Sequence, residues 1–441
     1  MKRLFSGLLL LVAAGAPAGA APAGADPVTD ALEQARARRV PVLIDFTAPW
    51  CYSCYYMARN VLNGPEWERA RREAVVVELD ADSPAGARWM AAWSVKAMPT
   101  YLVFNAQGAE LGRVLGEQTR RDFYAWLFAT TGRDSLESVR TRVVDGSEAS
   151  VAAAREVLRA QHARYDANGG LNWFLALPPP ARAALTRDPQ ASAWIARLEL
   201  QRAASENDLP GCVSVAPVAL DGPLGCERPY ELGKVMACAD KLPEAERRAL
   251  LRPQSELMQL LVDKRVLSNH RCADERSIVL TAADLQQALG NAAAEAQVLD
   301  RAIIDVKTRI GGDLRKDRNL SDNLRVYLDR AGRTEDLDLI LPKLIEAYPE
   351  DYVYPYRHAR SLAERGKHAE AAPLYEQAAA RTYGVNKLRI AELRAKSLQA
   401  LNRNDEARQV LSEALQANGP WFPEDAARLK ALLASLPPAT S

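Results

Sequence analysis

The sequence predicts a multidomain protein in which an N-terminal α/β domain is followed by an all-α region that ends in a helical solenoid. Three observations predict this fold class. Apolar runs of strand length alternate with helical segments from about residue 28 to residue 132. After residue 133 the strand signal disappears, and alanine, leucine, arginine and glutamate dominate. Near the C-terminus a helix–turn–helix pattern recurs at regular spacing.

Composition and charge are those of an ordinary globular protein. The chain has 441 residues, of which 48% are hydrophobic and 26% charged, a length that suggests about two to four domains. Its 57 basic and 56 acidic residues leave a net charge of +1. This balance predicts neither a nucleic-acid-binding surface nor a polybasic face for membranes.

The first 25 residues have the layout of a secretory signal peptide. The basic start Met1–Arg3 is followed by an apolar run and by small residues, with A-G-A cleavage sites ending at Ala20 and Ala25. An uncleaved membrane anchor is the alternative, but the apolar run is well short of the roughly 20 residues that span a bilayer. We therefore expect a periplasmic or secreted protein, without residues 1–25 and without stable membrane insertion. Disulfides persist in such oxidising compartments.

The N-terminal domain, residues 28–132, is expected to follow the order β-α-β-α-β-β-α. The run V-P-V-L-I-D-F indicates a buried first strand, and an apolar stripe at positions 54, 57, 58, 61 and 62 indicates the first helix. Asn63-Gly64-Pro65 is expected to end that helix. The other expected elements are a strand at 74–79, a helix at 84–94, strands at 100–104 and 111–115, and a helix at about 119–130.

The remainder of the chain divides at about residue 283. Residues 133–283 are expected to form a helical middle region with proline-rich breaks. Residues 284–418 contain units of helix, tight turn, acidic start and helix, with Gly332, Gly366 and Asn402 at equivalent turn positions. These units resemble tetratricopeptide repeats, although the tryptophan-type first anchor is missing. A generic helical bundle is the alternative.

The stretch T-A-P-W-C-Y-S-C places Cys51 and Cys54 three positions apart. A structural zinc site needs four Cys or His ligands, and the sequence offers no second ligand pair nearby, so no metal is expected. A purely structural disulfide would close a very small loop and stabilise weakly. A redox pair is favoured, because a helix N-terminus at Cys51 would lower the thiol pKa from about 8.5 to between about 3.5 and 7.5. Cys54, one turn on, could then resolve a mixed disulfide.

This stretch resembles the thioredoxin superfamily, and four features carry the resemblance. Asp45 lies six residues before Cys51, Trp50 directly precedes Cys51, M-P-T at 98–100 precedes a strand, and the element order fits. Within the superfamily the domain is most similar to the C-terminal domain of the bacterial transmembrane electron transporter of the Dsb system. The residues between the cysteines, Y-S, differ from the Gly-Pro of cytosolic thioredoxins.

The resemblance implies a role for each residue of the motif. Cys51 would be the nucleophile, Cys54 the resolving thiol, and Asp45, buried beneath Cys54, the proton acceptor. No cofactor is implied beyond the redox-active disulfide itself. The substrate groove would be formed by Trp50, Tyr52, Ser53, Met98 and the cis-proline Pro99. Simpler structural roles are the alternatives: a local hydrogen bond for Asp45, a strand start for Pro99, and packing for Trp50 and Tyr52.

Four further cysteines lie in one proline- and glycine-rich stretch, namely Cys212, Cys226, Cys238 and Cys272. They show no C-x-x-C spacing, so we expect two structural disulfides rather than a second redox relay. Four cysteines allow three pairings. Sequential pairing, Cys212 with Cys226 and Cys238 with Cys272, is weakly preferred.

Two functional hypotheses follow. The first is an exported thiol-disulfide oxidoreductase, on resemblance a reductase or isomerase, that acts on protein thiols and disulfides. It would need a separate electron donor or acceptor protein, and its helical repeats would recruit partners. The second is a non-catalytic envelope scaffold in which the α/β domain serves as a docking module.

Overall fold

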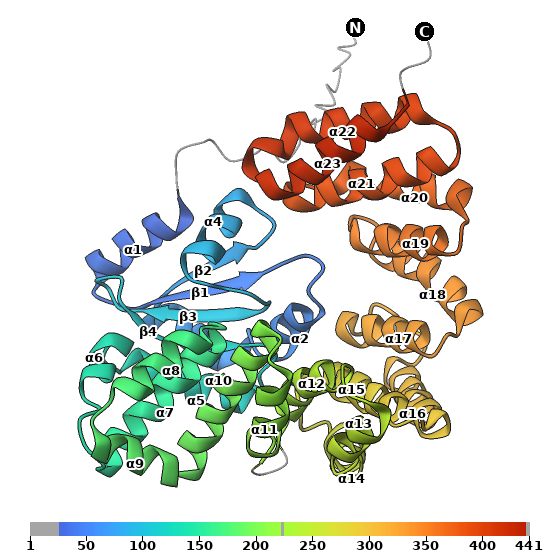
Figure 1. Cartoon of the computed structure of the whole chain (residues 1–441). Helices are drawn as coiled ribbons and strands as arrows, with labels where there is room; N and C mark the ends of the chain where they lie inside the picture. Colours follow the sequence, from blue (N-terminus) through green and yellow to red (C-terminus); the bar gives the residue numbers. More distant parts are fainter. Residues whose placement is uncertain (1–25, 222–224, 438–441) are drawn as a thin grey trace, which may run out of the picture.

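The computed structural model describes residues 26–221 and 225–437 (Figure 1). The predicted signal peptide, residues 1–25, lies outside the described residues. An α/β domain at the N-terminal end is followed by helices, which confirms the predicted fold class of these two parts. Across the described ranges, none of the helices combines the length and the apolar character that crossing a bilayer requires.

The N-terminal domain is built on a four-stranded sheet with the order β2-β1-β3-β4. The strands are β1 (Val42–Thr47), β2 (Val75–Asp80), β3 (Thr100–Phe104) and β4 (Glu110–Leu115). β1 runs parallel to β2 and antiparallel to β3, and β3 runs antiparallel to β4. The central strand β1 is thus paired on both sides, and it is buried along most of its length.

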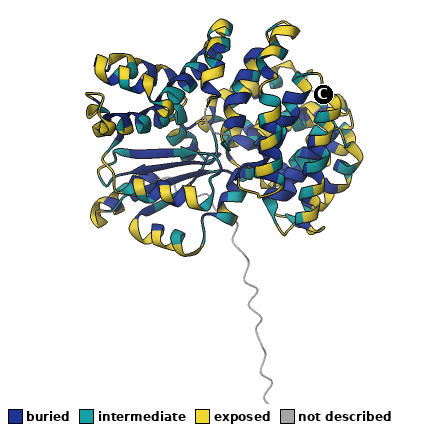
Figure 2. Ribbon diagram, turned by 90° about the horizontal axis from the view of Figure 1, so that it is seen from below, coloured by how far each residue is buried: buried dark blue, intermediate teal, exposed yellow. Residues whose placement is uncertain are grey.

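Helices cover both faces of this sheet (Figure 1). They are α1 (Pro27–Arg38), α2 (Tyr52–Asn60), α3 (Gly64–Glu73), α4 (Pro84–Ala92) and α5 (Arg120–Thr131). Side chains alternate along β1, so that Ile44 and Phe46 pack with α1 and α4, whereas Leu43 packs with α2, α3 and α5. The sheet is therefore the buried middle layer of three (Figure 2).

Two of these helices were not expected from the sequence. Helix α1 buries small residues, Ala31 and Ala35 among them, so its apolar period is weak. The Asn63-Gly64-Pro65 segment does follow the end of α2, but it also begins α3. Proline fits the first turn of a helix because its missing N–H has no partner there in any case. The predicted element order was therefore incomplete.

The helical region fills the rest of the described chain. Its helices are α6 (Leu136–Thr141), α7 (Glu148–Ala163), α8 (Ala167–Ala176), α9 (Pro179–Arg187), α10 (Pro189–Glu206), α11 (Leu209–Ala219), α12 (Arg228–Ala239), α13 (Glu244–Leu251), α14 (Gln254–Leu261), the π-helix η1 (Val262–Leu267), α15 (Glu275–Ala288), α16 (Ala292–Ile310), α17 (Arg318–Arg330), α18 (Thr334–Ala347), α19 (Val353–Glu364), α20 (His368–Arg381), α21 (Gly384–Ala400), α22 (Asn404–Asn418), the 3₁₀-helix η2 (Gly419–Trp421) and α23 (Pro423–Ser435).

Six helix hairpins in the described part of this region share one turn geometry. Their turn residues all have positive φ angles, namely Tyr165, Asn207, Gly290, Gly332, Gly366 and Asn402. In each turn the next backbone N–H donates to the carbonyl five residues back, as in a Schellman motif. The three turn positions matched in the sequence are thus equivalent in the structure, but the hairpins of α7–α8, α10–α11 and α15–α16 share the same turn. Their classification as tetratricopeptide repeats stays a prediction.

The helical region wraps around the N-terminal domain (Figure 1). Helices α6 and α7 pack beside β4, and α17 packs against α2. At the far end of the arc, Ala87 of α4 packs against the apolar cluster of α20–α23. The concave side of the helical region therefore faces the start of α2, where the C-x-x-C motif lies.

The four cysteines of the middle region form two disulfides, but the preferred sequential pairing is wrong. Cys212 pairs with Cys238, with Cα atoms 6.5 Å apart, and Cys226 pairs with Cys272, with Cα atoms 5.5 Å apart. Helices α11 and α12 pack against each other, which brings Cys212 and Cys238 together. Cys226 lies just before α12 and is left to pair across to the loop that precedes α15. The two closed loops therefore interleave.

A close backbone approach joins the end of the arc to the N-terminal domain. The backbone N–H of Val385, in the first turn of α21, donates to the carbonyl oxygen of Asp82 at 3.3 Å. Gly384 has a φ of +57°, and a Cβ atom there would lie 1.8 Å from the same oxygen. Only glycine satisfies both the conformation and the space.

Gly384→Ala is expected to lower the free energy of unfolding by about 2–4 kcal/mol, because it adds a steric clash to the cost of a left-handed residue. Gly366→Ala is the matched control, because Gly366 also has a positive φ but has no neighbouring atom within 4 Å of a Cβ. The control is expected to cost about 1 kcal/mol. Urea denaturation measures both, and equal costs would contradict the close approach.

Candidate functional site

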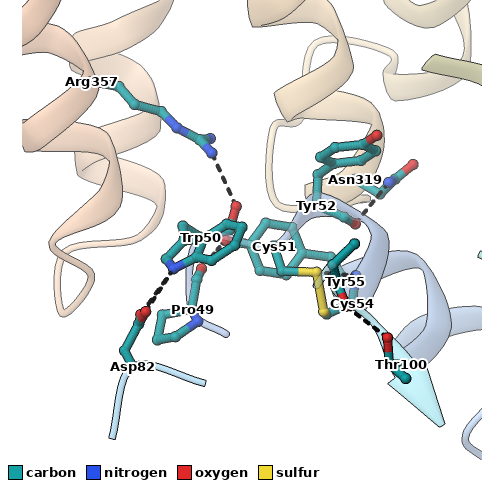
Figure 3. The surroundings of a disulfide bond; sticks show 11 residues. Pro49, Trp50, Cys51, Tyr52, Cys54, Tyr55, Asp82, Thr100, Asn319 and Arg357 are labelled. Carbon is teal, nitrogen blue, oxygen red and sulfur yellow. Dashed lines mark hydrogen bonds between the residues drawn. A yellow bond between two sulfur atoms is a disulfide. The ribbon is translucent and has the colours of Figure 1, made fainter. Parts of the chain in front are cut away.

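The strand β1 leads directly into the C-x-x-C motif. The chain turns through Ala48-Pro49-Trp50 and enters α2 at Tyr52, so that Cys51 is the N-cap residue. The Cys51 Sγ accepts a hydrogen bond from the backbone N–H of Cys54 at 3.1 Å. The two sulfurs are bonded, with Cα atoms 5.2 Å apart (Figure 3). The Cys51 sulfur therefore lies where helix N–H groups and the macrodipole favour negative charge.

Apolar side chains surround the disulfide. Ala48 and Ala81 pack against it as buried residues, and Met90 and Met98 pack against it as half-buried ones. The Met98–Pro99 peptide bond is cis, and Pro99 is buried at the start of β3. The structure thus places Met98 against the cysteine pair, with Pro99 directly after it.

Asp45 is a buried carboxyl group in the centre of β1. Its residue is 6% exposed, and its Oδ1 atom is buried without a hydrogen-bond partner. Burial, with a smaller contribution from the nearby charge of Glu78, raises the pKa of Asp45 to about 8. A carboxyl group with this pKa exchanges protons near neutral pH, which suits a proton acceptor for a thiol.

The helical region holds both neighbours of Cys51. Arg357 of α19 donates from Nη2 to the backbone oxygen of Trp50 at 3.1 Å, and Asn319 of α17 donates from Nδ2 to the backbone oxygen of Tyr52 at 2.9 Å (Figure 3). The guanidinium of Arg276 lies 3.4 Å from the centre of the Tyr52 ring. The helical region thus contacts the residues on both sides of Cys51, and Trp50 also lines a cavity of about 400 Å³ beside α19.

Tyr55 and Arg59 of α2 also contact the helical region. The guanidinium of Arg318 lies 4.0 Å from the centre of the Tyr55 ring. One turn further on, Arg59 forms an ion pair with Asp317 at 3.0 Å. Cation–π contacts and ion pairs thus fix α2 against the start of α17.

Asp82 joins the redox motif to the end of the arc. Its carboxylate accepts hydrogen bonds from the Trp50 indole Nε1 at 2.9 and 3.1 Å, from Asn386 Nδ2 at 2.6 Å and from the Tyr352 hydroxyl at 3.4 Å. The residue is 3% exposed, and burial raises the pKa of this carboxyl group. One buried acid therefore links the motif to α19 and α21.

A third buried acid lies beside the motif. Glu117, in the loop after β4, lies next to Ser53, the residue between Tyr52 and Cys54. Burial raises the pKa of Glu117 well above its usual range, and the charge of Asp274 acts in the same direction. Ser53 is itself buried. This side of the motif is therefore closed by side chains.

Little of the cysteine pair is open to solvent. Cys51 is 3% exposed and Cys54 is 8% exposed, whereas Trp50 is 36% exposed. The predicted groove residue Met98 packs against the disulfide, whereas the helical region contacts Tyr52, and Ser53 is buried beside Glu117. Sequence reasoning missed the residues of the helical region that contact Trp50 and Tyr52, because Arg276, Asn319 and Arg357 carry no motif of their own.

Comparisons with known proteins agree with this geometry. The sequence model of the thioredoxin-like domain family matches residues 28–131. The thiol:disulfide interchange protein DsbD of Cronobacter sakazakii is 36% identical over 95 residues, which are 21% of this chain and 16% of that protein. Thioredoxin C-3 of Corynebacterium nephridii is 32% identical over 88 residues, which are 20% of this chain and 57% of that protein. Thioredoxin H-type 1 of Nicotiana tabacum is 37% identical over 75 residues, 17% of this chain and 55% of that protein. The chain thus spans about one sixth of this DsbD protein and just over half of the two thioredoxins.

The buried state of Asp45 predicts a specific pH dependence of stability. The folded protein favours the protonated acid, with a pKa of about 8, and the unfolded chain favours the ionised acid above pH 3.8. The free energy of unfolding therefore falls as pH rises between these two values. Asp45→Asn is expected to match the wild type near pH 4 and to be roughly 1–4 kcal/mol more stable at pH 7.

Urea denaturation of the oxidised protein at a series of pH values measures this difference. Asp30→Asn, which replaces an exposed acid of α1, is the matched control and is expected to show little change. A constant difference between Asp45→Asn and the wild type across the series would show that Asp45 is not the titrating group.

Proposed function

We propose that this chain, whose residues 28–131 form a thioredoxin-like domain, is an exported thiol-disulfide oxidoreductase. The observation that carries the proposal is the position of Cys51 at the N-cap of α2, bonded to Cys54 one turn on. The matched relative from Cronobacter sakazakii is named a thiol:disulfide interchange protein. The basic and apolar layout of residues 1–25 supports export to the periplasm.

The exchange proceeds in two steps. In the reduced protein the Cys51 thiolate attacks one sulfur of a partner disulfide, a new S–S bond forms, and the other partner sulfur leaves as a thiolate. Cys54 then loses its proton to ionised Asp45 and attacks the Cys51 sulfur. This second step restores the Cys51–Cys54 bond and releases the second partner sulfur as a thiolate. Two electrons pass from the cysteine pair to the partner.

Reduction of the pair returns the electrons. A separate donor with two thiols attacks the Cys51–Cys54 bond and is itself oxidised to a disulfide, so two electrons enter the chain. We propose that this donor or acceptor is another protein, and that clients are protein thiols and disulfides. The helical region would position such partners at the motif. On the resemblance, a reductase or isomerase role is favoured over that of a primary oxidase.

The covered state of the motif favours a second candidate. With Cys51 3% exposed, a non-catalytic envelope scaffold would need no exchange at the disulfide, and the thioredoxin-like domain would serve as a docking module. The two candidates differ in one measurable property, since the scaffold does not need the Cys51 sulfur.

Reduction of insulin disulfides with dithiothreitol as electron source separates these candidates. Cys51→Ser is expected to lose at least about 100-fold in rate, because it lacks the nucleophile. The matched control replaces Cys212 and Cys238 with serine, which removes another disulfide but keeps Cys51 and Cys54. That control is expected to stay active. Equal rates for Cys51→Ser and the wild type would favour the scaffold.

Equilibration of the Cys51–Cys54 pair with glutathione tests the direction of electron flow. A reductase or isomerase is expected to have a reduction potential between about −270 and −180 mV. A value near about −120 mV would instead indicate an oxidase of the disulfide-forming type.

A further inference from the structure

Three arginines converge on one buried acid at the interface of the two parts. Asp322 of α17 has no exposed surface. Its carboxylate forms ion pairs with Arg276 at 2.7 Å, with Arg325 at 3.1 Å and with Arg357. This set of four residues, called here the arginine cluster, holds three positive charges against one negative charge. Its surplus is two positive charges in a region of low exposure.

Two members of the arginine cluster contact the redox motif. Arg357 donates to the backbone oxygen of Trp50, and Arg276 lies on the ring of Tyr52. Trp50 and Tyr52 are the residues directly before and after Cys51. The surplus charge therefore contacts the residues on both sides of Cys51.

Acids near the motif do not cancel this surplus. Burial raises the pKa of Asp45 to about 8 and that of Glu117 well above its usual range, so burial disfavours a negative charge on both groups. The positive charge of Arg389 lies near the Asp82 carboxyl group and acts to lower its pKa. Asp274, which accepts from the Tyr230 hydroxyl at 2.6 Å, offsets one charge of the cluster. At least one positive charge remains in excess among these described residues.

We propose that Arg276 and Arg357 are positioning residues that stabilise Cys51 as a thiolate in the reduced protein and thereby raise the reduction potential of the Cys51–Cys54 pair. This inference rests on the proposed function. When a donor dithiol reduces the disulfide, the pair takes up two electrons. The Cys51 sulfur then keeps its negative charge, and the Cys54 sulfur takes one proton. Low-dielectric surroundings strengthen the attraction between that thiolate and the guanidinium groups.

The attraction between these guanidinium groups and a thiolate would be weaker if the arginines lay at the surface. Solvent and salt screen exposed pairs, whereas Arg276, Arg325 and Arg357 have side chains that are 6%, 14% and 17% exposed. The helical region thus supplies a fixed field at a sulfur of another domain. It adds to the field of α2 itself, which acts on the same atom.

Arg276→Gln and Arg357→Gln test the proposal in the full-length protein. Each variant is expected to reduce the thiolate fraction of Cys51 up to about tenfold at pH values below the midpoint of its titration. Ultraviolet absorbance and alkylation across a pH series measure this fraction. A tenfold loss corresponds to a reduction potential up to about 30 mV more negative in glutathione equilibrium. Each variant leaves Asp322 with two arginine partners, so its charge stays paired.

Three further variants separate charge from packing. Arg357→Lys keeps the charge and is expected to stay near the wild type. Asn319→Ala removes the hydrogen bond to the Tyr52 backbone without changing any charge, and it is also expected to stay near the wild type. Asp322→Asn enlarges the surplus and is expected to shift the midpoint and the potential in the opposite direction to the Gln variants.

The proposal fails if the Gln variants titrate like the wild type, or if Asn319→Ala shifts the midpoint as far as they do. Circular dichroism checks that each variant is folded. Should a Gln variant not fold, the sign of the Asp322→Asn shift decides, and a shift toward less thiolate overturns the proposal. Insulin reduction that survives in all the arginine variants but not in Cys51→Ser would leave the proposed function standing in either case.

Discussion

The carboxylate of Asp82 is the contact on which the arrangement of the redox motif and the helical region depends. It lies on the loop after β2, and it receives donors from Trp50, from Tyr352 before α19 and from Asn386 in α21. A buried carboxylate is costly unless its lone pairs are filled, so each donor has a defined place. Because the three donors come from three separate segments, one acid fixes the relative position of all of them.

The contacts that hold α2 also cover its reactive end. Arg357 and Asn319 use the backbone oxygens on both sides of Cys51, and Arg318 lies over Tyr55. These contacts are hydrogen bonds, ion pairs and cation–π contacts. Polar interfaces of this kind are typical of domains that move relative to each other. A helical region held in this way orients the motif through polar contacts.

Much of the N-terminal domain could be predicted from the sequence because its signals are local. The apolar run of β1, the C-x-x-C spacing and the proline at 99 each report on a few neighbouring residues. Helices α1 and α3 were missed, since small buried residues and a proline in the first turn give a weak periodic signal. The pairing of Cys212 with Cys238 and of Cys226 with Cys272 depends on how α11 and α12 pack, which no local pattern encodes. The same holds for the cover of the site: Arg276 and Arg357 are far from the motif in sequence and contact Tyr52 and Trp50 only through tertiary structure.

The absence of a side-chain cap at the start of α21 has a consequence for the order of assembly. The first turn of that helix takes its acceptors from Asp82, both from the main chain and from the carboxylate. Domains form as units, and the N-terminal one emerges first during synthesis. The loop after β2 can therefore fold before the C-terminal helices are synthesised and pack against it. Closure of the arc at this point therefore requires that the loop after β2 has already formed.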